Sequence, residues 1–294
     1  MDNFEGKIAV VTGGASGMGR ELVIQLAGAG CNVAMCDLSV EEMAETKELA
    51  LAGAPGVQIT THRCDVSDEA SILALRDEVI AQHETDHINL LFNNAGLSGG
   101  GSIIADTRES WDHCFAVCWG GVYYGTRAFM PLLMAADEGH IVNTSSVNGF
   151  WASIGADRPH TAYSAAKFAV KGFSEALITD LRVNAPHVKV SVVMPGHIGT
   201  SIVENSVRHG VTELDFETTE LMQTVSTMFR EHAPMTAAEA STVILDGVRT
   251  ERWRILVGDD AHDLDEAVRA DPEAAYDGLT LGPGLLPDPD ELGI

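Results

Sequence analysis

The sequence is poor in basic residues. Lys and Arg together number 18 against 43 Asp and Glu, which gives a formal net charge of −25. Nucleic acids and anionic membranes bind positive surfaces, so this imbalance argues against both as partners. The chain also lacks any run near the roughly 18 unbroken apolar residues needed to span a bilayer. Its first residues, MDNFEGKIAVVTGG, show no basic stretch ahead of an apolar one, so we expect no signal peptide and a cytoplasmic location.

Cysteines are few and irregularly spaced. The five are Cys31, Cys36, Cys64, Cys114 and Cys118. An odd set without framework spacing predicts free thiols in a reducing compartment rather than disulfides. Cys114 and Cys118 stand four residues apart and would share one face of a helix. A zinc site needs about four ligands, and only His113 adds one nearby, so no metal site is expected.

The chain is rich in short apolar segments that alternate with amphipathic ones. Strands are predicted at 7–13, 31–37, 57–66, 88–96, 140–146, 188–196 and 253–258. Helices are predicted at 17–29, 40–53, 68–85, 107–136, 162–184 and 236–250. Strands dominated by Val, Ile and Ala suit a parallel sheet that is buried on both faces. The alternation predicts an α/β fold with a doubly wound, mainly parallel seven-stranded sheet, helices on both faces, and a ligand crevice at the carboxyl ends of the strands.

Two segments depart from this alternation. Residues 199–235 fit no strand–helix unit, and their length predicts a substrate lid or binding loop within a domain of residues 1–260. Residues 261–294 form an acidic C-terminal extension. From residue 259 to the end there are eleven Asp or Glu and one basic residue, Arg269, so a solvated acidic tail is expected.

A glycine-rich turn, TGGASGMG from Thr12 to Gly19, follows the first strand and opens the first helix. Gly13 can form the tight turn, and Gly17 and Gly19 let backbone amides and the helix N-terminus approach a pyrophosphate. Asp37 ends the second strand, where its carboxylate can accept hydrogen bonds from an adenosine ribose and would repel a 2′-phosphate. Neither Ser16 nor Leu38 is basic, so NAD is predicted in preference to NADP.

The segment TAYSAAKFAV places Tyr163 and Lys167 four residues apart on one helical face. A phenol has an ordinary pKa near 10 and is a poor base at neutral pH, and a cation held beside it lowers that pKa. By itself this spacing also fits a plain amphipathic helix. Three strands, however, end in polar segments that should meet at the same sheet edge, namely NNAG at 93–96, NTSS at 143–146 and PGHIGT at 195–200.

These motifs, together with CDLS at 36–39 and CDV at 64–66, occur in an order that resembles the short-chain dehydrogenase/reductase family, whose members have one Rossmann-type domain. The resemblance covers residues 7 to 200. It implies an NAD(P)-dependent alcohol dehydrogenase or carbonyl reductase that acts on a small molecule. It also implies a homotetramer or homodimer built partly on the helices at 107–136 and 162–184.

The resemblance also implies residue roles. Tyr163 would be the general acid/base, Lys167 would bind the nicotinamide ribose and lower the pKa of Tyr163, and Ser146 would hydrogen-bond the substrate oxygen. With the glycine turn and Asp37 included, the residues expected at the cofactor are Gly13, Ser16, Gly17, Met18, Gly19, Asp37, Leu38, Asp65, Val66, Asn94, Ala95, Gly96, Tyr163, Lys167, Pro195, Gly196, Ile198 and Thr200.

The substrate pocket is expected between the 147–160 loop and the 199–235 lid. The loop is a few residues longer than is usual in the family. The residues predicted to face the substrate are Ser98, Val147, Asn148, Trp151, His160 and His197. The lid is apolar, with several Met and Phe residues and only two basic ones, Arg208 and Arg230. Such a lid suits a bulky hydrophobic or aromatic secondary alcohol or ketone.

Cys118 is a departure from the family pattern. The corresponding position normally holds an asparagine that helps retain a water linking the lysine to solvent. A thiol is a much weaker donor and acceptor, so a reduced or rerouted proton relay is expected, whereas Cys114 is expected to pack in the core. The alternative function is a catalytically weak or silent nucleotide-binding sensor or scaffold, supported only by Cys118. Turnover of aromatic secondary alcohols with NAD distinguishes the two.

Overall fold

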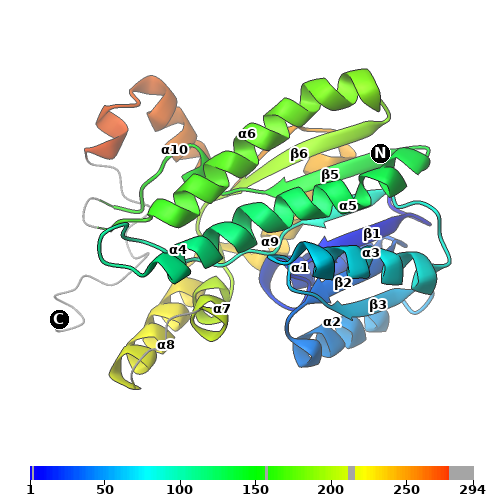
Figure 1. Cartoon of the computed structure of the whole chain (residues 1–294), viewed down its shortest axis with the longest axis horizontal. Coiled ribbons are helices and arrows are strands. Elements are labelled where there is room, and N and C mark those ends of the chain that lie inside the picture. Colours follow the sequence, from blue (N-terminus) through cyan, green and yellow to red (C-terminus); the bar gives the residue numbers. More distant parts are fainter. Residues whose placement is uncertain (2, 156–157, 211–215, 278–294) are drawn as a thin grey trace.

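Seven strands pair side by side in the computed structural model, which describes residues 1, 3–155, 158–210 and 216–277 (Figure 1). The order is β3-β2-β1-β4-β5-β6-β9, and every pairing is parallel. The strands are β1 (Ile8–Thr12), β2 (Asn32–Asp37), β3 (Ile59–Arg63), β4 (Leu90–Asn93), β5 (Gly139–Thr144), β6 (Val188–Pro195) and β9 (Arg254–Val257). The predicted doubly wound α/β fold is therefore confirmed.

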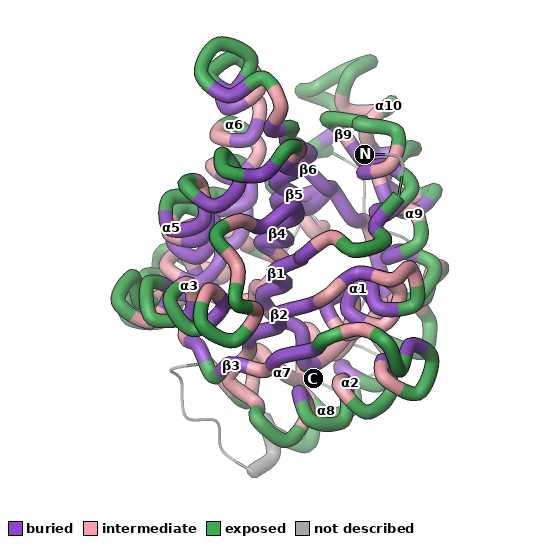
Figure 2. The backbone as a smooth tube through the Cα atoms, turned by 90° about the vertical axis from the view of Figure 1, so that its right-hand side faces the viewer, coloured by how far each residue is buried: buried purple, intermediate pink, exposed green. Residues whose placement is uncertain are grey.

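Helices cover both faces of the sheet. One face holds α1 (Gly17–Gly28), α2 (Val40–Gly53) and α9 (Ala237–Arg249); the other holds α3 (Glu69–His83), α4 (Arg108–Phe115), α5 (Gly121–Ala135) and α6 (Thr161–Asn184) (Figure 2). In β1, Ala9 and Val11 pack on the face covered by α1, α2 and α9, whereas Val10 packs on the opposite face. Burial on both faces explains why the strands are apolar throughout rather than alternating. Within the described ranges, no helix is both long enough and apolar enough to cross a bilayer.

The helix predicted at 107–136 is not a regular α-helix. Its middle, Ala116–Gly120, is a π-helical segment that joins α4 to α5. Such segments are rare, frequently occur at functional sites, and have no signature in the spacing of apolar residues. Cys118 lies at the centre of this segment.

The 199–235 region, predicted as a lid or loop, contains two helices. The chain leaves the sheet through β7 (Ile198–Gly199), forms α7 (Ile202–His209) and α8 (Phe216–Glu231), and returns through β8 (Met235–Thr236). The two short strands pair with each other, Ile198 with Met235 and Gly199 with Thr236. Both ends of the segment are therefore held at one point, and α7 and α8 project together from the end of the molecule that also carries α10 (Asp259–Ala270) (Figure 1).

The ends of β4 and β5 are joined by a buried chain of amides. Asn93 Nδ2 donates to Asn143 Oδ1 at 2.8 Å and to Thr126 Oγ1 at 3.2 Å. Asn143 Nδ2 in turn donates to Ser174 Oγ on α6 at 3.0 Å. Buried amides are costly without partners, so this chain holds two strands and two helices in a single arrangement.

Part of the acidic extension is folded onto the domain. Helix α10 and the turn Ala274–Tyr276 pack against the 147–160 loop, where Ala261, Leu264 and Ala275 are buried around Trp151. Trp151 Nε1 donates to the carbonyl oxygen of Ala275 at 2.8 Å. Residues 259–277 are therefore not the solvated tail that their charge suggests, because α10 turns apolar side chains inward. Residues 278–294 lie outside the described ranges.

Trp151 should therefore matter for stability. Trp151→Phe leaves the Ala275 carbonyl without its donor and opens a gap at a fully buried position, so the free energy of unfolding should fall by about 1–3 kcal/mol. The matched control is Trp253→Phe, because Trp253 is 44% exposed. Urea unfolding followed by circular dichroism measures both variants, and equal stability of the two would contradict the assigned contact.

Candidate active site

The glycine turn between β1 and α1 is tightly packed. Gly13 has φ +69°, and a Cβ placed on it would lie 2.9 Å from the Ala95 Cα. A Cβ on Gly19 would lie 1.9 Å from the carbonyl oxygen of Gly13. Both positions therefore require glycine. Ser16 precedes α1 but its side chain does not cap the helix, so the first N–H groups of α1, which have no intrahelical partners, are available to an anion.

The start of the glycine turn, at Thr12, is held against the end of β4. The Thr12 hydroxyl accepts the backbone N–H groups of Asn94 and Ala95, each at 3.0 Å, and donates to the carbonyl oxygen of Phe92 at 3.3 Å. Asn94 Nδ2 returns a bond to the carbonyl oxygen of Thr12 at 3.1 Å. The Asn94 amide thus has a structural partner in addition to its place at the crevice.

Asp37, at the end of β2, connects the strand to the glycine turn. Its Oδ2 accepts the Ala15 N–H at 3.1 Å, and its Oδ1 accepts the N–H groups of Leu38 at 2.7 Å and Ser39 at 3.2 Å. These bonds orient the carboxylate at the crevice wall. A carboxylate has about four lone-pair sites and three are occupied, so about one remains for a ribose hydroxyl.

These elements enclose a crevice of about 160 Å³. The predicted cofactor residues that line it are Gly13, Ser16, Gly17, Met18, Asp37, Leu38, Asp65, Val66, Asn94, Ala95, Gly96 and Thr200. Gly19 lies behind the turn. A helix N-terminus, glycines that keep the backbone open and a carboxylate one strand away fit a nicotinamide dinucleotide.

A larger cavity of about 560 Å³ continues from this crevice, and the two share Met18, Asn94, Gly96, Thr200 and Ile202. Its wall contains Ser146, Tyr163 and Lys167, together with Pro195, Gly196 and Ile198 at the end of β6. Residues predicted to bind the nicotinamide and to act on the substrate therefore meet in one space.

The catalytic candidates are held by their neighbours. Lys167 Nζ donates to the carbonyl oxygen of Thr144 at 2.9 Å and lies 5.3 Å from the centroid of the Tyr163 ring. Ser146 hydrogen-bonds Tyr163 and accepts the Asn148 N–H at 3.1 Å. Ser145 points instead to the backbone of α6, where its hydroxyl donates to the Lys167 carbonyl oxygen at 2.7 Å. Ser146 is thus the serine beside Tyr163, as predicted.

Burial raises the pKa of Tyr163, and the nearby charge of Cys118 adds to the rise, while the hydrogen bond with Ser146 opposes it. The spacing of Tyr163 and Lys167 in the sequence predicts the opposite direction, a pKa lowered by the lysine. In this structure the ammonium of Lys167 lies over the ring and is bonded to Thr144, so desolvation dominates. The raised pKa keeps Tyr163 protonated, so it carries the proton that a reduction requires, although it is a weaker acid than a free phenol.

Cys118 is fully buried next to Lys167. A methyl group on Gly96 would lie 3.5 Å from Lys167 Nζ and 3.8 Å from Cys118 Sγ, so both atoms gather around that glycine. When protonated, the Cys118 thiol donates to the carbonyl oxygen of Leu97 at 3.2 Å, and only its ionised form carries the charge that raises the pKa of Tyr163. The hydrogen bond with Cys114 and the charge of Lys167 lower the pKa of Cys118, against burial, which raises it. Cys118 lines neither cavity, and it lies beside Gly96, Leu97 and Lys167, which do.

Five of the six predicted substrate residues line the large cavity: Ser98, Val147, Asn148, His160 and His197. Trp151 does not, because its indole is buried against Ala275. His160 packs against Tyr163 with ring centroids 4.7 Å apart, and burial lowers its pKa to about 4, so it is neutral at pH 7. His197 bonds the Phe229 carbonyl oxygen through Nε2 at 2.6 Å and anchors the start of the lid.

The roof of the large cavity comes from α7 and α8. Its side chains are Ile202, Val203, Ser206, Met222, Val225 and Phe229. The apolar composition of 199–235 predicted a lid, but the sequence does not show which helical face turns inward. Ile154 and Arg158 line the cavity as well; they belong to the 147–160 loop that was expected at the pocket but were not named individually.

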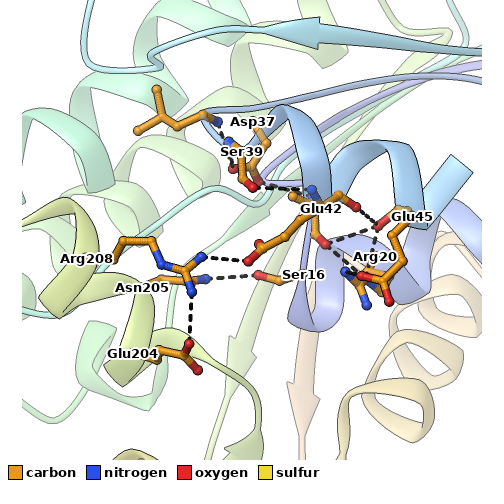
Figure 3. A network of polar contacts seen from close by, with 12 residues as sticks. Ser16, Arg20, Asp37, Ser39, Glu42, Glu45, Glu204, Asn205 and Arg208 are labelled. Carbon is orange, nitrogen blue, oxygen red and sulfur yellow. Dashed lines mark hydrogen bonds and ion pairs between the residues drawn. The ribbon is translucent and has the colours of Figure 1, made fainter. Parts of the chain in front are cut away.

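Helix α7 also crosses to the nucleotide side of the crevice (Figure 3). Asn205 Nδ2 donates to Ser16 Oγ at 2.9 Å, and Arg208 pairs with Glu42 on α2 at 2.6 Å and with Glu204 at 2.9 Å. Asn205, His209, His113 and Glu42 line the nucleotide crevice without having been predicted. Only Glu42 had a sequence signal, since it lies in the first turn of the helix that follows Asp37.

The cysteines and acidic residues give no sign of a metal centre. All five thiols are free and buried. In the part of the chain that the structure describes, no group of three or more His, Cys, Asp or Glu side chains is placed to hold a metal ion.

Known proteins share both the sequence and the fold. The profile of the family described as short chain dehydrogenase matches residues 7–210. A Mycobacterium tuberculosis protein named as an oxidoreductase, SadH, is 36% identical over 270 residues, 92% of this chain and 92% of the relative. The levodione reductase of Leifsonia aquatica is 31% identical over 207 residues, which make up 70% of this chain and 74% of the reductase.

Two solved structures bear on the cofactor. A short chain dehydrogenase/reductase from Burkholderia phymatum in complex with NAD superposes with a TM-score of 0.80 at 27% identity, over 96% of this chain and 99% of that chain. A metagenomic short-chain oxidoreductase in complex with NADP has a TM-score of 0.58 at 33% identity, over 66% of this chain and 83% of that chain. The profile match, the relatives and the site agree: the chain belongs to the short-chain dehydrogenase/reductase family of oxidoreductases, which bind nicotinamide cofactors.

Proposed function

We propose that the protein is an NAD-dependent oxidoreductase that transfers a hydride between the nicotinamide and a secondary alcohol or ketone with a bulky hydrophobic or aromatic skeleton. The observation that carries the proposal is the placement of Ser146, Tyr163 and Lys167 on the wall of a largely apolar cavity that continues into the nucleotide crevice.

The proposed roles at the cofactor follow the crevice wall. The first turn of α1 would hold the pyrophosphate, Asp37 the adenosine ribose, and Pro195 to Thr200 the nicotinamide. When bound, the nicotinamide supplies the carbon that gives or accepts the hydride. Asp37 supports NAD over NADP because its charge would repel a 2′-phosphate, and the Burkholderia phymatum relative was solved with NAD.

The residues of this chain handle the proton and the geometry. In reduction, the substrate oxygen would accept hydrogen bonds from Ser146 and Tyr163, and the neutral hydroxyl of Tyr163 would donate its proton to that oxygen. The ammonium of Lys167 would then stabilise the tyrosinate. In oxidation the same proton returns to Tyr163. Helices α7 and α8 cover the reacting atoms and keep water out.

The substrate class follows from the cavity lining. Apolar side chains from α7 and α8 form the roof, and His160, neutral at pH 7, is a polar group directly beside Tyr163. This lining, apolar apart from a few groups such as Arg158 and His160, suits an apolar skeleton with one reacting oxygen. That a relative is named levodione reductase supports a ketone as substrate.

We further propose a homotetramer or homodimer that forms through α5 and α6. Tyr123 on α5 is 39% exposed and stacks on Trp119, which meets the ring of Phe173 on α6 edge-on. Phe168, elsewhere on α6, is 42% exposed. Exposed aromatic side chains on neighbouring helices are typical of contacts between protein copies. Analytical ultracentrifugation tests this, and a monomer at micromolar concentration would contradict it.

The function itself is tested by mixing the purified protein with NAD and a panel of aromatic secondary alcohols, or with NADH and the matching ketones, and following NADH absorbance. We expect turnover with NAD and bulky members of the panel. Tight NAD binding without any turnover would support the sensor alternative instead.

Tyr163→Phe should lower kcat/KM by about 10²–10⁴-fold because the ring remains and only the proton donor is lost. NADH binding, measured by fluorescence titration, should change little. Tyr124→Phe is the matched control, since Tyr124 on α5 lines neither cavity. Equal activity of the two variants would exclude Tyr163 as the acid/base.

Cys118→Ala should shift the pH profile of alcohol oxidation. The charge of Cys118 raises the pKa of Tyr163, and oxidation needs the deprotonated tyrosine, so activity rises with pH through that pKa. Removing the charge should move the midpoint to lower pH by roughly half a unit to one unit. Cys31→Ala, a buried thiol remote from the site, is the control. An unchanged midpoint, or one at higher pH, would show that Cys118 does not act on Tyr163.

A further inference from the structure

Two arginines lie close to the proposed ribose site, and both are already paired with acids (Figure 3). Arg20 bonds Glu45 at 2.7 Å, Thr46 at 3.0 Å and the Ala15 carbonyl oxygen at 2.9 Å. Arg208 bonds Glu42 at 2.6 Å and Glu204 at 2.9 Å. Net charge alone would not reveal this arrangement, because cations are present next to the crevice but each is neutralised.

Glu42 differs from the other glutamates in its position. It lines the nucleotide crevice together with Asp37 and Leu38, whereas Glu45 and Glu204 do not. Its backbone N–H is held by Ser39 Oγ at 3.3 Å, so it lies in the capped first turn of α2 directly after the ribose-binding strand. Its carboxylate therefore adds negative charge beside Asp37, and it also forms an ion pair with the guanidinium of Arg208.

We propose that Glu42 is a cofactor-specificity residue that acts through Arg208. A 2′-phosphate next to Asp37 would meet a second carboxylate, and the guanidinium best placed to bind it would already be engaged. A 2′-hydroxyl brings no charge and leaves the pair intact. The proposal rests on the proposed use of a nicotinamide dinucleotide, and it adds a second determinant, on α2 and the lid, to the carboxylate of Asp37.

The same pair joins cofactor choice to the lid. Arg208 belongs to α7, whose Asn205 also bonds Ser16 of the glycine turn at 2.9 Å. A phosphate that displaced Glu42 from Arg208 would break one of the contacts by which α7 is held across the crevice. A cofactor that carries a 2′-phosphate would therefore be penalised by charge repulsion and also by a loosened roof over the substrate.

The test compares Glu42→Gln with Glu45→Gln. The first variant keeps the side-chain shape and removes one of the two carboxylates that pair with Arg208, since Glu204 remains. The second makes the same change on the same helix, at a residue that does not line the crevice. Dissociation constants for NADPH and NADH are measured by fluorescence titration of the purified protein, with circular dichroism to verify folding. Glu42→Gln should strengthen NADPH binding about tenfold and change NADH binding less than about threefold, whereas Glu45→Gln should change neither by more than about twofold.

The double variant Glu42→Gln, Arg208→Ala identifies the group responsible. If the guanidinium of Arg208, released from residue 42, binds the phosphate, then adding Arg208→Ala should abolish most of the gain in NADPH affinity. A gain that survives removal of Arg208, or no gain in Glu42→Gln, would overturn the proposal. Glu42→Ala serves as the second variant and should also favour NADPH.

These outcomes are separate from those of the proposed function. If the protein binds NADH but turns over no alcohol or ketone, the oxidoreductase proposal fails while the binding constants still decide on Glu42. If neither dinucleotide binds to any variant, both proposals fail.

Discussion

The rest of the site depends on the hydrogen bonds that the hydroxyl of Thr12 makes. This hydroxyl accepts two backbone N–H groups from the end of β4 and so fixes the distance between β1 and β4. Between these two strands the strand order of the sheet reverses. The nucleotide crevice and the substrate cavity meet at this place. Because the bonds involve backbone atoms, the glycine turn on one side and Asn94 to Gly96 on the other move together or not at all.

Much of this arrangement could be predicted from residue order. Buried strands, a glycine turn and polar residues at strand ends are local patterns, and the topology of a parallel sheet brings those ends to one edge. Tyr163, Lys167 and Ser146 meet for that reason, although they come from a helix and a strand end. The crevice residues from Gly13 to Asp37 follow from a single βαβ unit.

The features that could not be predicted depend on long-range packing. The sequence predicts that Trp151 lines the pocket, but in the structure it is covered by α10 and the turn that follows. Nothing near Trp151 in the sequence indicates that contact. The π-helical segment at Ala116–Gly120 changes the position of Cys118 without changing the order of residues. The direction of the pKa shift of Tyr163 depends on where the Lys167 ammonium points, and spacing along a helix does not determine this. The inward face of α7 depends on Ser16 and Glu42, far away in the sequence.

The two short strands at the base of the lid have a consequence for how this protein can diverge. Since Ile198 and Met235 pair, the 36 positions between them form a segment whose two ends are joined next to the end of β6. Changing the length of a loop with joined ends costs little free energy, because the closure entropy grows only slowly with length. The segment between β7 and β8 can therefore change in length and sequence without refolding the seven-stranded sheet, which makes it the part of the domain most free to diverge.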